Sequence, residues 1–142
     1  MKKLIPLLLA IFMLLVTQVT LGATETKMSV SGVVSPAAYE TISGGEGKLV
    51  NNRNGTINIS GFTKTYKQVK EIGLKLHLQY LSNGSWRTVD SYSYTKTNSS
   101  SVSGGEKLSV SSGYYRVFAQ HTSYNGSKNE SGRSYSQALY IE

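Results

Sequence analysis

The chain has 142 residues, no cysteine, and a formal net charge of +7 that comes from 15 basic and 8 acidic residues. Without cysteine it cannot form disulfides, a thiolate metal site or a lipid anchor attached through sulfur. The basic residues are scattered rather than clustered, which argues against a nucleic-acid partner. The charge is typical of solubilisation or of attraction to anionic polymers outside the cell.

The N-terminal residues have the order of a secretory signal peptide. Lys2 and Lys3 precede an apolar run at residues 4–16, and the small pair Gly22 and Ala23 follows. The run has 13 residues, whereas a membrane span needs about 20. We therefore expect cleavage after Ala23 and a secreted, extracellular protein with no stable membrane anchor. A cysteine-free secreted chain of this size favours a bacterial source.

Residues 24–142 are long enough for one hydrophobic core, so the sequence predicts a single domain. In chain order, the first strands are expected at residues 28–34 and 56–63, the second with Ile57 and Ile59 on one face. Between them, the glycine-rich residues 43–47 indicate a flexible turn.

Residues 72–80 carry the clearest period of two in the chain. This alternation predicts a strand with one face on the core and one toward solvent. Asn83 and Gly84 follow, which is the strongest short hairpin signal, so the chain is expected to return along residues 86–94. The alternating residues are Ile72, Leu74, Leu76, Leu78 and Tyr80 on one side, and Gly73, Lys75, His77 and Gln79 on the other.

Further along, the pattern predicts a polar loop at residues 97–105 and strands at 107–111, 113–123 and 135–141. No stretch after the signal has convincing helical periodicity. About seven or eight short strands with regular turn signals indicate an all-β fold, an antiparallel β-sandwich spanning residues 24–142.

One local pattern of the chain resembles a known family. It consists of Leu108 followed by Gly113, Tyr114, Tyr115, Arg116 and Val117. The pattern resembles the entry to the sixth strand of immunoglobulin-like and fibronectin-like domains, where a tyrosine closes a corner. The resemblance implies an immunoglobulin-like sandwich, with Tyr115 as the corner tyrosine and Val117 where antibodies carry a cysteine. The whole chain is also similar to short secreted proteins of unknown function from Gram-positive bacteria. That similarity implies a compartment and a fold but no activity.

Enzymatic chemistry finds little support in the residues. The acidic side chains are spread along the chain without a paired-carboxylate motif, and His77 and His121 are the only histidines. No metal-ligand spacing and no nucleophile elbow occur, and Gly44, Gly45 and Gly47 lack the following helix that a phosphate cradle needs. We expect a protein that is not an enzyme and that binds no cofactor or metal.

A surface remains as the candidate site. If residues 72–80 pair with residues 113–123, and these with the last strand, the side chains that alternate with the core share one outer face. Aromatic rings stack on sugars or apolar partners, and arginine binds carboxylate or phosphate with two parallel hydrogen bonds. The alternative is that exposed aromatic pairs only stabilise the sheet. The candidate ligand-binding residues are Lys75, His77, Tyr114, Arg116, Phe118 and Tyr140, with Gln79 beside them.

Three other residues complete the predicted arrangement. Trp86, next to the Asn83 and Gly84 turn, is expected to close one end of the core, with an exposed anchor for a partner as the alternative. Tyr92 and Tyr94 share its parity and form an aromatic stripe with it. Both histidines are expected to be ordinary surface residues.

These observations favour a non-catalytic extracellular binding or cell-surface-associated module. Its partner would be a cell-wall polymer, a glycan or an extracellular protein. The alternative is a secreted bacteriocin-like or toxin-like antagonist drawn to anionic envelopes, although no amphipathic helix supports it. A third interpretation is a matrix protein that assembles by strand addition along exposed edges.

Overall fold

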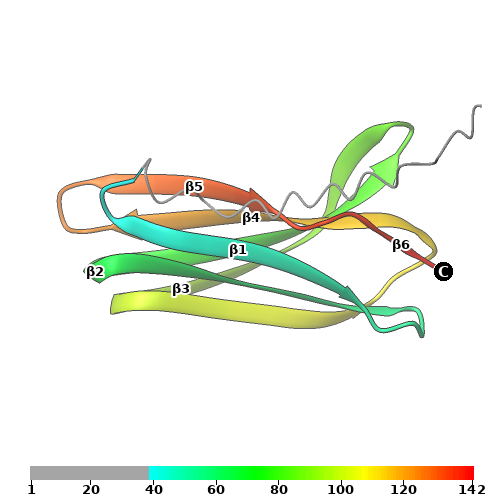
Figure 1. Ribbon diagram of the computed structural model, residues 1–142, viewed down its shortest axis with the longest axis horizontal. Coiled ribbons are helices and arrows are strands. Elements are labelled where there is room, and N and C mark those ends of the chain that lie inside the picture. Colours follow the sequence, from blue (N-terminus) through cyan, green and yellow to red (C-terminus); the bar gives the residue numbers. More distant parts are fainter. Residues whose placement is uncertain (1–38) are drawn as a thin grey trace, which may run out of the picture.

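The computed structural model describes residues 39–142, which form six antiparallel strands and no helix (Figure 1). In this part of the chain there is consequently no helix able to cross a membrane. The predicted all-β, antiparallel character is confirmed, whereas the signal peptide and the strand expected at residues 28–34 lie outside the described residues. The strands are β1 (Ile42–Asn51), β2 (Thr56–Ser82), β3 (Ser85–Ser109), β4 (Gly113–Tyr124), β5 (Asn129–Tyr135) and β6 (Leu139–Ile141).

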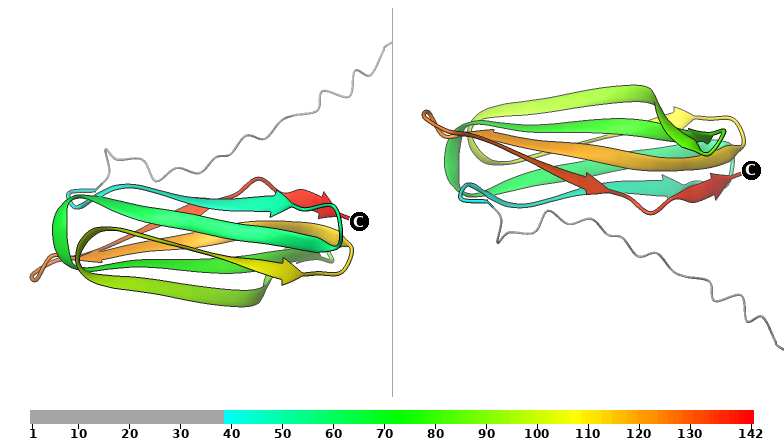
Figure 2. Two further views of the ribbon diagram at one scale, coloured as in Figure 1. Left: turned by 90° about the horizontal axis from the view of Figure 1, so that it is seen from below. Right: turned by 90° about the horizontal axis from the view of Figure 1, so that it is seen from above.

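The strands make two layers that face each other (Figure 2). The first half of β2 pairs with β1 and with the second half of β3. The second half of β2 pairs with the first half of β3 and with β4, which also pairs with β5 and β6. β2 and β3 pass from one layer to the other where their register shifts, between Lys64 and Val69.

This bend explains why the structure has six strands rather than seven or eight. The strands predicted at residues 56–63 and 72–80 are the two halves of β2. The polar loop predicted at residues 97–105 is wrong, because this stretch belongs to β3 and continues to pair with β2. The sequence of this stretch is typical of a loop because it is rich in serine. Ser100, Ser101 and Ser103 are exposed to solvent, whereas Val102 points inward and is buried.

The turn predicted at residues 43–47 is also wrong, because these residues lie within β1. The glycines serve close approach rather than flexibility. A Cβ atom at Gly45 would lie 2.4 Å from Nδ1 of His121, and one at Gly47 would lie 2.9 Å from Cβ of Ala119. Both neighbours belong to β4 in the other layer, so the absence of side chains on β1 lets the two layers meet there.

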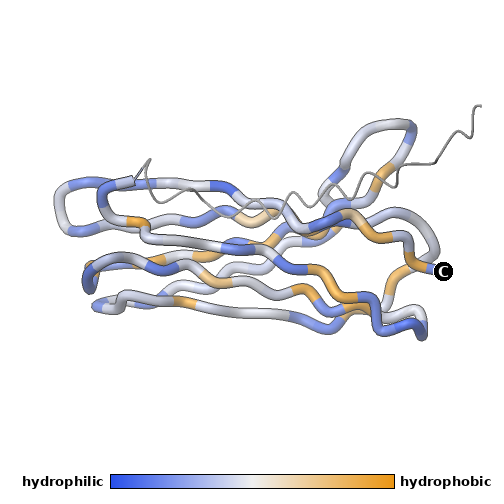
Figure 3. The backbone as a smooth tube through the Cα atoms, in the orientation of Figure 1, coloured by the Kyte–Doolittle hydropathy of each residue, from blue (hydrophilic) through white to orange (hydrophobic). Residues whose placement is uncertain are grey.

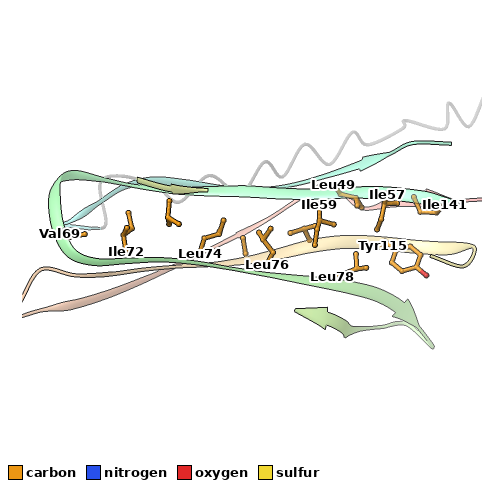
Figure 4. Packing of buried hydrophobic residues seen from close by; sticks show 13 residues of the cluster. Leu49, Ile57, Ile59, Val69, Ile72, Leu74, Leu76, Leu78, Tyr115 and Ile141 are labelled. Atoms are coloured by element: carbon orange, nitrogen blue, oxygen red, sulfur yellow. The ribbon is translucent and has the colours of Figure 1, made fainter. Parts of the chain in front are cut away.

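The core fills the space between the layers (Figure 4). Apolar and hydrophilic residues alternate along the strands that enclose it (Figure 3). Leu49, Ile57 and Ile59 come from the first layer. The inward positions predicted for the second layer are confirmed, and its buried residues include Ile72, Leu74, Leu76, Leu78, Tyr115, Val117 and Ala119.

Tyr115, which the sequence predicts as a corner tyrosine, is buried near the start of β4. Its ring is 4 % exposed and packs against Tyr80, with 5.1 Å between the ring centroids. Its hydroxyl lies 3.3 Å from Oγ of Ser111, four residues upstream. The partner is therefore a side chain, whereas the corner tyrosine of immunoglobulin domains bonds to the backbone.

The strand predicted at residues 135–141 is split into β5 and β6, which both pair with β4. At the break, the hydroxyl of Ser136 accepts the backbone N–H of Val117 at 2.7 Å, and the N–H of Ser136 donates to the Val117 carbonyl at 2.8 Å. These two bonds keep the chain attached to β4 between the two short strands.

Glu130 of β5 ties the start of β1 to the other layer. Its buried carboxylate accepts the backbone N–H groups of Glu40, Thr41 and Ile42 at 2.9 to 3.0 Å. Burial alone would raise the pKa of Glu130, but these three bonds and the nearby Lys128 ammonium lower it below its ordinary value. The carboxylate is therefore charged in the folded protein and holds the chain that enters β1.

Replacing Glu130 with Gln should destabilise the protein by about 1.5 to 3 kcal/mol, the scale of a hydrogen bond to a charged group. The amide retains one acceptor oxygen, so part of the backbone N–H set loses its partner. Urea unfolding at pH 7 measures the loss, and Glu71→Gln on the exposed side of β2 serves as the control. Equal unfolding midpoints for the two variants would contradict the role of Glu130.

Candidate functional site

Strand pairing arranges the outward side chains of β2 to β5 in rows that cross the sheet. One row contains Ser91, His77, Phe118 and Tyr135, which are direct partners on β3, β2, β4 and β5. The next row contains Gln79 between Thr88 and Arg116. The candidate residues predicted on these strands therefore share one face, which we call the outer face.

The rings of the first row stack on one another. The centroids of His77 and Phe118 are 5.2 Å apart with planes at 16°, and those of Phe118 and Tyr135 are 5.0 Å apart at 21°. Rings this close and nearly parallel cover each other's faces. Phe118 is therefore covered from within the sheet, and the stack stabilises neighbouring strands as cross-strand aromatic pairs do.

His77 is fixed within this stack by its ring nitrogens. Nδ1 lies 2.7 Å from Oγ of Ser91, and Nε2 lies 2.9 Å from Oε1 of Gln120. Both nitrogens thus have partners on neighbouring strands. His77 is half-buried, and these two contacts hold its ring in place within the face.

Arg116 is the most unusual residue of the outer face. Its guanidinium carbon lies 4.4 Å from the Trp86 ring centroid and 4.7 Å from that of Tyr135, and its Nε donates to Oε1 of Gln79 at 2.8 Å. We call Trp86, Arg116 and Tyr135 the arginine clamp. Burial by these neighbours lowers the pKa of Arg116 from its ordinary value, although a guanidinium stays charged in proteins.

No carboxylate balances this cation within residues 39–142, where the ion pairs all involve Lys128. The Nη atoms of Arg116 likewise have no hydrogen-bond partner in the described part of the chain. Removing a charge from water is costly, so an anion that paired with this half-buried guanidinium would offset part of that cost. The arginine clamp therefore fixes the positively charged guanidinium of Arg116 in place and leaves its Nη–H groups available to donate hydrogen bonds.

The remaining candidate residues lie around the clamp on the same face. Tyr114 and Tyr140 form an edge-to-face pair with 5.0 Å between centroids, and both are about half exposed. Lys75 is exposed in a row with Gln120 and Arg133. Their placement is as predicted, and a role in ligand binding stays a prediction for all six residues.

Trp86 does not close the core, as the sequence predicted, but lies half-buried on the outer face against Arg116. The reason is a bulge, because Leu78 pairs with Asp90 while Gln79 pairs with Thr88. Val89 is the extra, unpaired residue of this bulge. It shifts the alternation of β3 by one position, so residues of the same parity point to opposite sides before and after the bulge. Tyr92 and Tyr94 consequently pack toward the core, while Trp86 on the projecting β2–β3 hairpin (Figure 1) points the other way.

His121 is fully buried, so its prediction as a surface residue is wrong. Oγ1 of Thr63 lies 2.8 Å from Nδ1, and Oγ of Ser134 lies 2.8 Å from Nε2. The Thr63 hydroxyl donates its one proton to the Gly73 carbonyl at 3.0 Å, so it must accept from Nδ1–H. Nε2 then accepts from Ser134, which fixes a neutral tautomer.

This buried cluster resembles a serine and histidine pair, but its position speaks against nucleophilic catalysis. Thr63 and Ser134 are 0 % and 1 % exposed, so no substrate reaches the Ser134 hydroxyl in this conformation. Burial lowers the pKa of His121 to about 4. The cluster acts as a polar contact between the layers, built from hydroxyls that satisfy both ring nitrogens.

Within residues 39–142, no three histidine, aspartate or glutamate side chains gather in a group that could hold a metal ion. A scan against models of known protein families and a search of curated proteins find no match to this chain. The similarity to secreted proteins of Gram-positive bacteria therefore stays a prediction.

Proposed function

We propose that this protein is a secreted, non-catalytic binding module that attaches to an anionic polymer outside the cell through its outer face. We further propose that its two layers form an immunoglobulin-like sandwich. Three features support that fold assignment: the second half of β2 pairs with β4, β4 pairs with the last two strands, and Tyr115 is buried two residues before the inward Val117.

The arginine clamp carries the functional proposal. Two aromatic rings and Gln79 hold the guanidinium in one orientation, which reduces the entropy that an arginine loses on binding. Its unused donors form a planar fork that matches the two oxygens of a carboxylate or phosphate. An anion at this position would also supply the charge partner that residues 39–142 lack.

Charge on the rest of the outer face supports an anionic ligand over a neutral one. Lys75 and Arg133 lie in a row next to the aromatic stack, and Glu71 at the far end is the acidic side chain of the face. The ring faces of the stack are occupied by one another. Since sugars stack on open ring faces, the row around Phe118 favours attachment through charge rather than through sugar stacking.

Substituting Arg116 tests this function. Arg116→Lys keeps the charge but loses the fork, and Arg116→Glu reverses the charge. We expect both variants to bind isolated Gram-positive cell wall more weakly by more than about 1 kcal/mol, with the larger loss for Glu. Sedimentation with wall that carries its anionic polymers, and with wall stripped of them, measures the effect.

Lys64→Glu provides the matched control, because Lys64 is exposed and belongs to the other layer. It should reduce binding only at low salt, as diffuse charge attraction does. Thermal melts of all variants establish that they are folded. Equal losses for Arg116→Glu and Lys64→Glu, or wild-type binding abolished by moderate salt, would overturn the proposal.

A further inference from the structure

β3 is an edge strand along its whole length. It spans 25 residues and pairs only with β2, and its other edge has no partner within residues 39–142. Because β3 bends with β2, it forms the edge of both layers (Figure 2). An unpaired edge offers a row of backbone N–H and C=O groups to which another strand can add.

The regular part of this edge is short and weakly protected. It extends from Asp90 to Thr97, between the bulge at Val89 and Asn98, whose φ of 48° interrupts the extended backbone. Within it there is no proline, and the charged residues are Asp90 and Lys96, both exposed. The Asp90 carboxylate accepts the backbone N–H of Ser91 and the hydroxyl of Tyr92. Natural edges are usually blunted by proline, repeated charge or bulges, and here such features stand only at the ends.

The sequence of this stretch is complementary to itself in the antiparallel direction. With Ser93 at the centre, Asp90 of one copy lies opposite Lys96 of the other. In the same register Tyr92 lies opposite Tyr94, and Ser91 opposite Thr95. Two-fold symmetry repeats each pair, so both charges of the stretch are matched in both copies.

We propose that two copies of this protein associate through β3, antiparallel and centred on Ser93. Opposite-charge, aromatic and hydroxyl pairs directly across two strands are each favourable. Moving the centre by one residue places Asp90 opposite Tyr94 or Asn98 and loses both charge pairs. The symmetric contact uses the β3 edge of both copies, so along this edge it gives a closed dimer rather than a growing fibre.

Charge reversal at the two ends of the stretch tests the register. Asp90→Lys places lysine opposite lysine twice, and Lys96→Asp places aspartate opposite aspartate twice. Each variant should lower the association constant of the purified secreted protein at least about tenfold. The double variant with both changes should restore it. Sedimentation equilibrium at concentrations up to about 1 mM measures the association, since pairing through one strand buries little area and is weak.

Mixing the two single variants gives the sharpest result. In a mixed dimer each of the two end pairs again joins one lysine and one aspartate, so the heterodimer should form at least about tenfold more readily than either variant associates alone. Lys107→Asp, in the second half of β3, changes charge outside the register and should have no effect. A wild-type protein that stays monomeric at about 1 mM, or a mixture that behaves as its separate components, would overturn the proposal.

Discussion

Replacing Leu76 with Asp should unfold the protein. Leu76 is 0 % exposed and lies between the layers on the central strand of the second layer. A carboxylate there has no cationic partner and must either lose its hydration or take up a proton. We expect a destabilisation of at least about 4 kcal/mol, a large part of the stability of a domain of this size. Near-ultraviolet circular dichroism and a thermal melt report the loss.

The neighbouring residue Lys75 provides the control because it points to the opposite side of the same strand and is exposed. Lys75→Ala should change stability by no more than about 0.5 kcal/mol. Val117→Asp on β4 should behave like Leu76→Asp, since Val117 is equally buried. If Leu76→Asp and Lys75→Ala melted alike, the inward and outward assignment of β2 would be wrong.

The parts of the fold that could be predicted are those in which local pattern and burial agree. From Ile72 to Leu78 every second residue is apolar, and each of these side chains is buried. The same alternation placed Tyr115 and Val117 inside and Arg116 outside. The outer face followed from this, because a period of two fixes both sides of a strand at once.

The failures arise where contacts distant in sequence decide the conformation. Gly45 and Gly47 read as a turn because only the approach of β4 shows why side chains are missing there. The bulge at Val89 moves Trp86 to the outer face. The residue types of β3 do not indicate where this bulge lies. His121 is buried because Thr63 and Ser134, on other strands, satisfy its nitrogens. Nothing in the residues next to it shows this.

Dimerisation through β3 would strengthen the attachment of the arginine clamp to an anionic polymer. Pairing through β3 would join the second layers of two copies edge to edge, which would bring two arginine clamps into one dimer. A weak anion site gains strength when two copies attach to the same polymer, since the second binding event becomes intramolecular. Dimerisation and wall binding remain separable, because Asp90 and Lys96 lie on the β3 edge and Arg116 on β4.

Acid should weaken the protein through His121 before it affects the carboxylates. The pKa of His121 is about 4 in the folded protein, against 6.5 as its ordinary value. The unfolded chain therefore takes up a proton from about pH 6.5 downward, and the folded protein does so only near pH 4. The stabilisation is complete above pH 6.5 and is lost as the pH falls toward 4, by about 3 kcal/mol in total. Glu130, whose pKa is lowered from 4.5, adds its own loss as the pH falls below about 4.5.

Urea unfolding at steps between pH 7 and pH 4 tests this expectation. His121→Gln should be less stable at pH 7 but should show a much flatter pH dependence above pH 4.5, because the titrating ring is gone. His77→Gln removes the other histidine, on the outer side of the same sheet, and serves as the comparison. A proton NMR titration gives an independent measure that does not depend on a variant that folds. The His121 ring should stay neutral down to about pH 5, and a midpoint near 6.5 would show that protonation costs the folded state nothing.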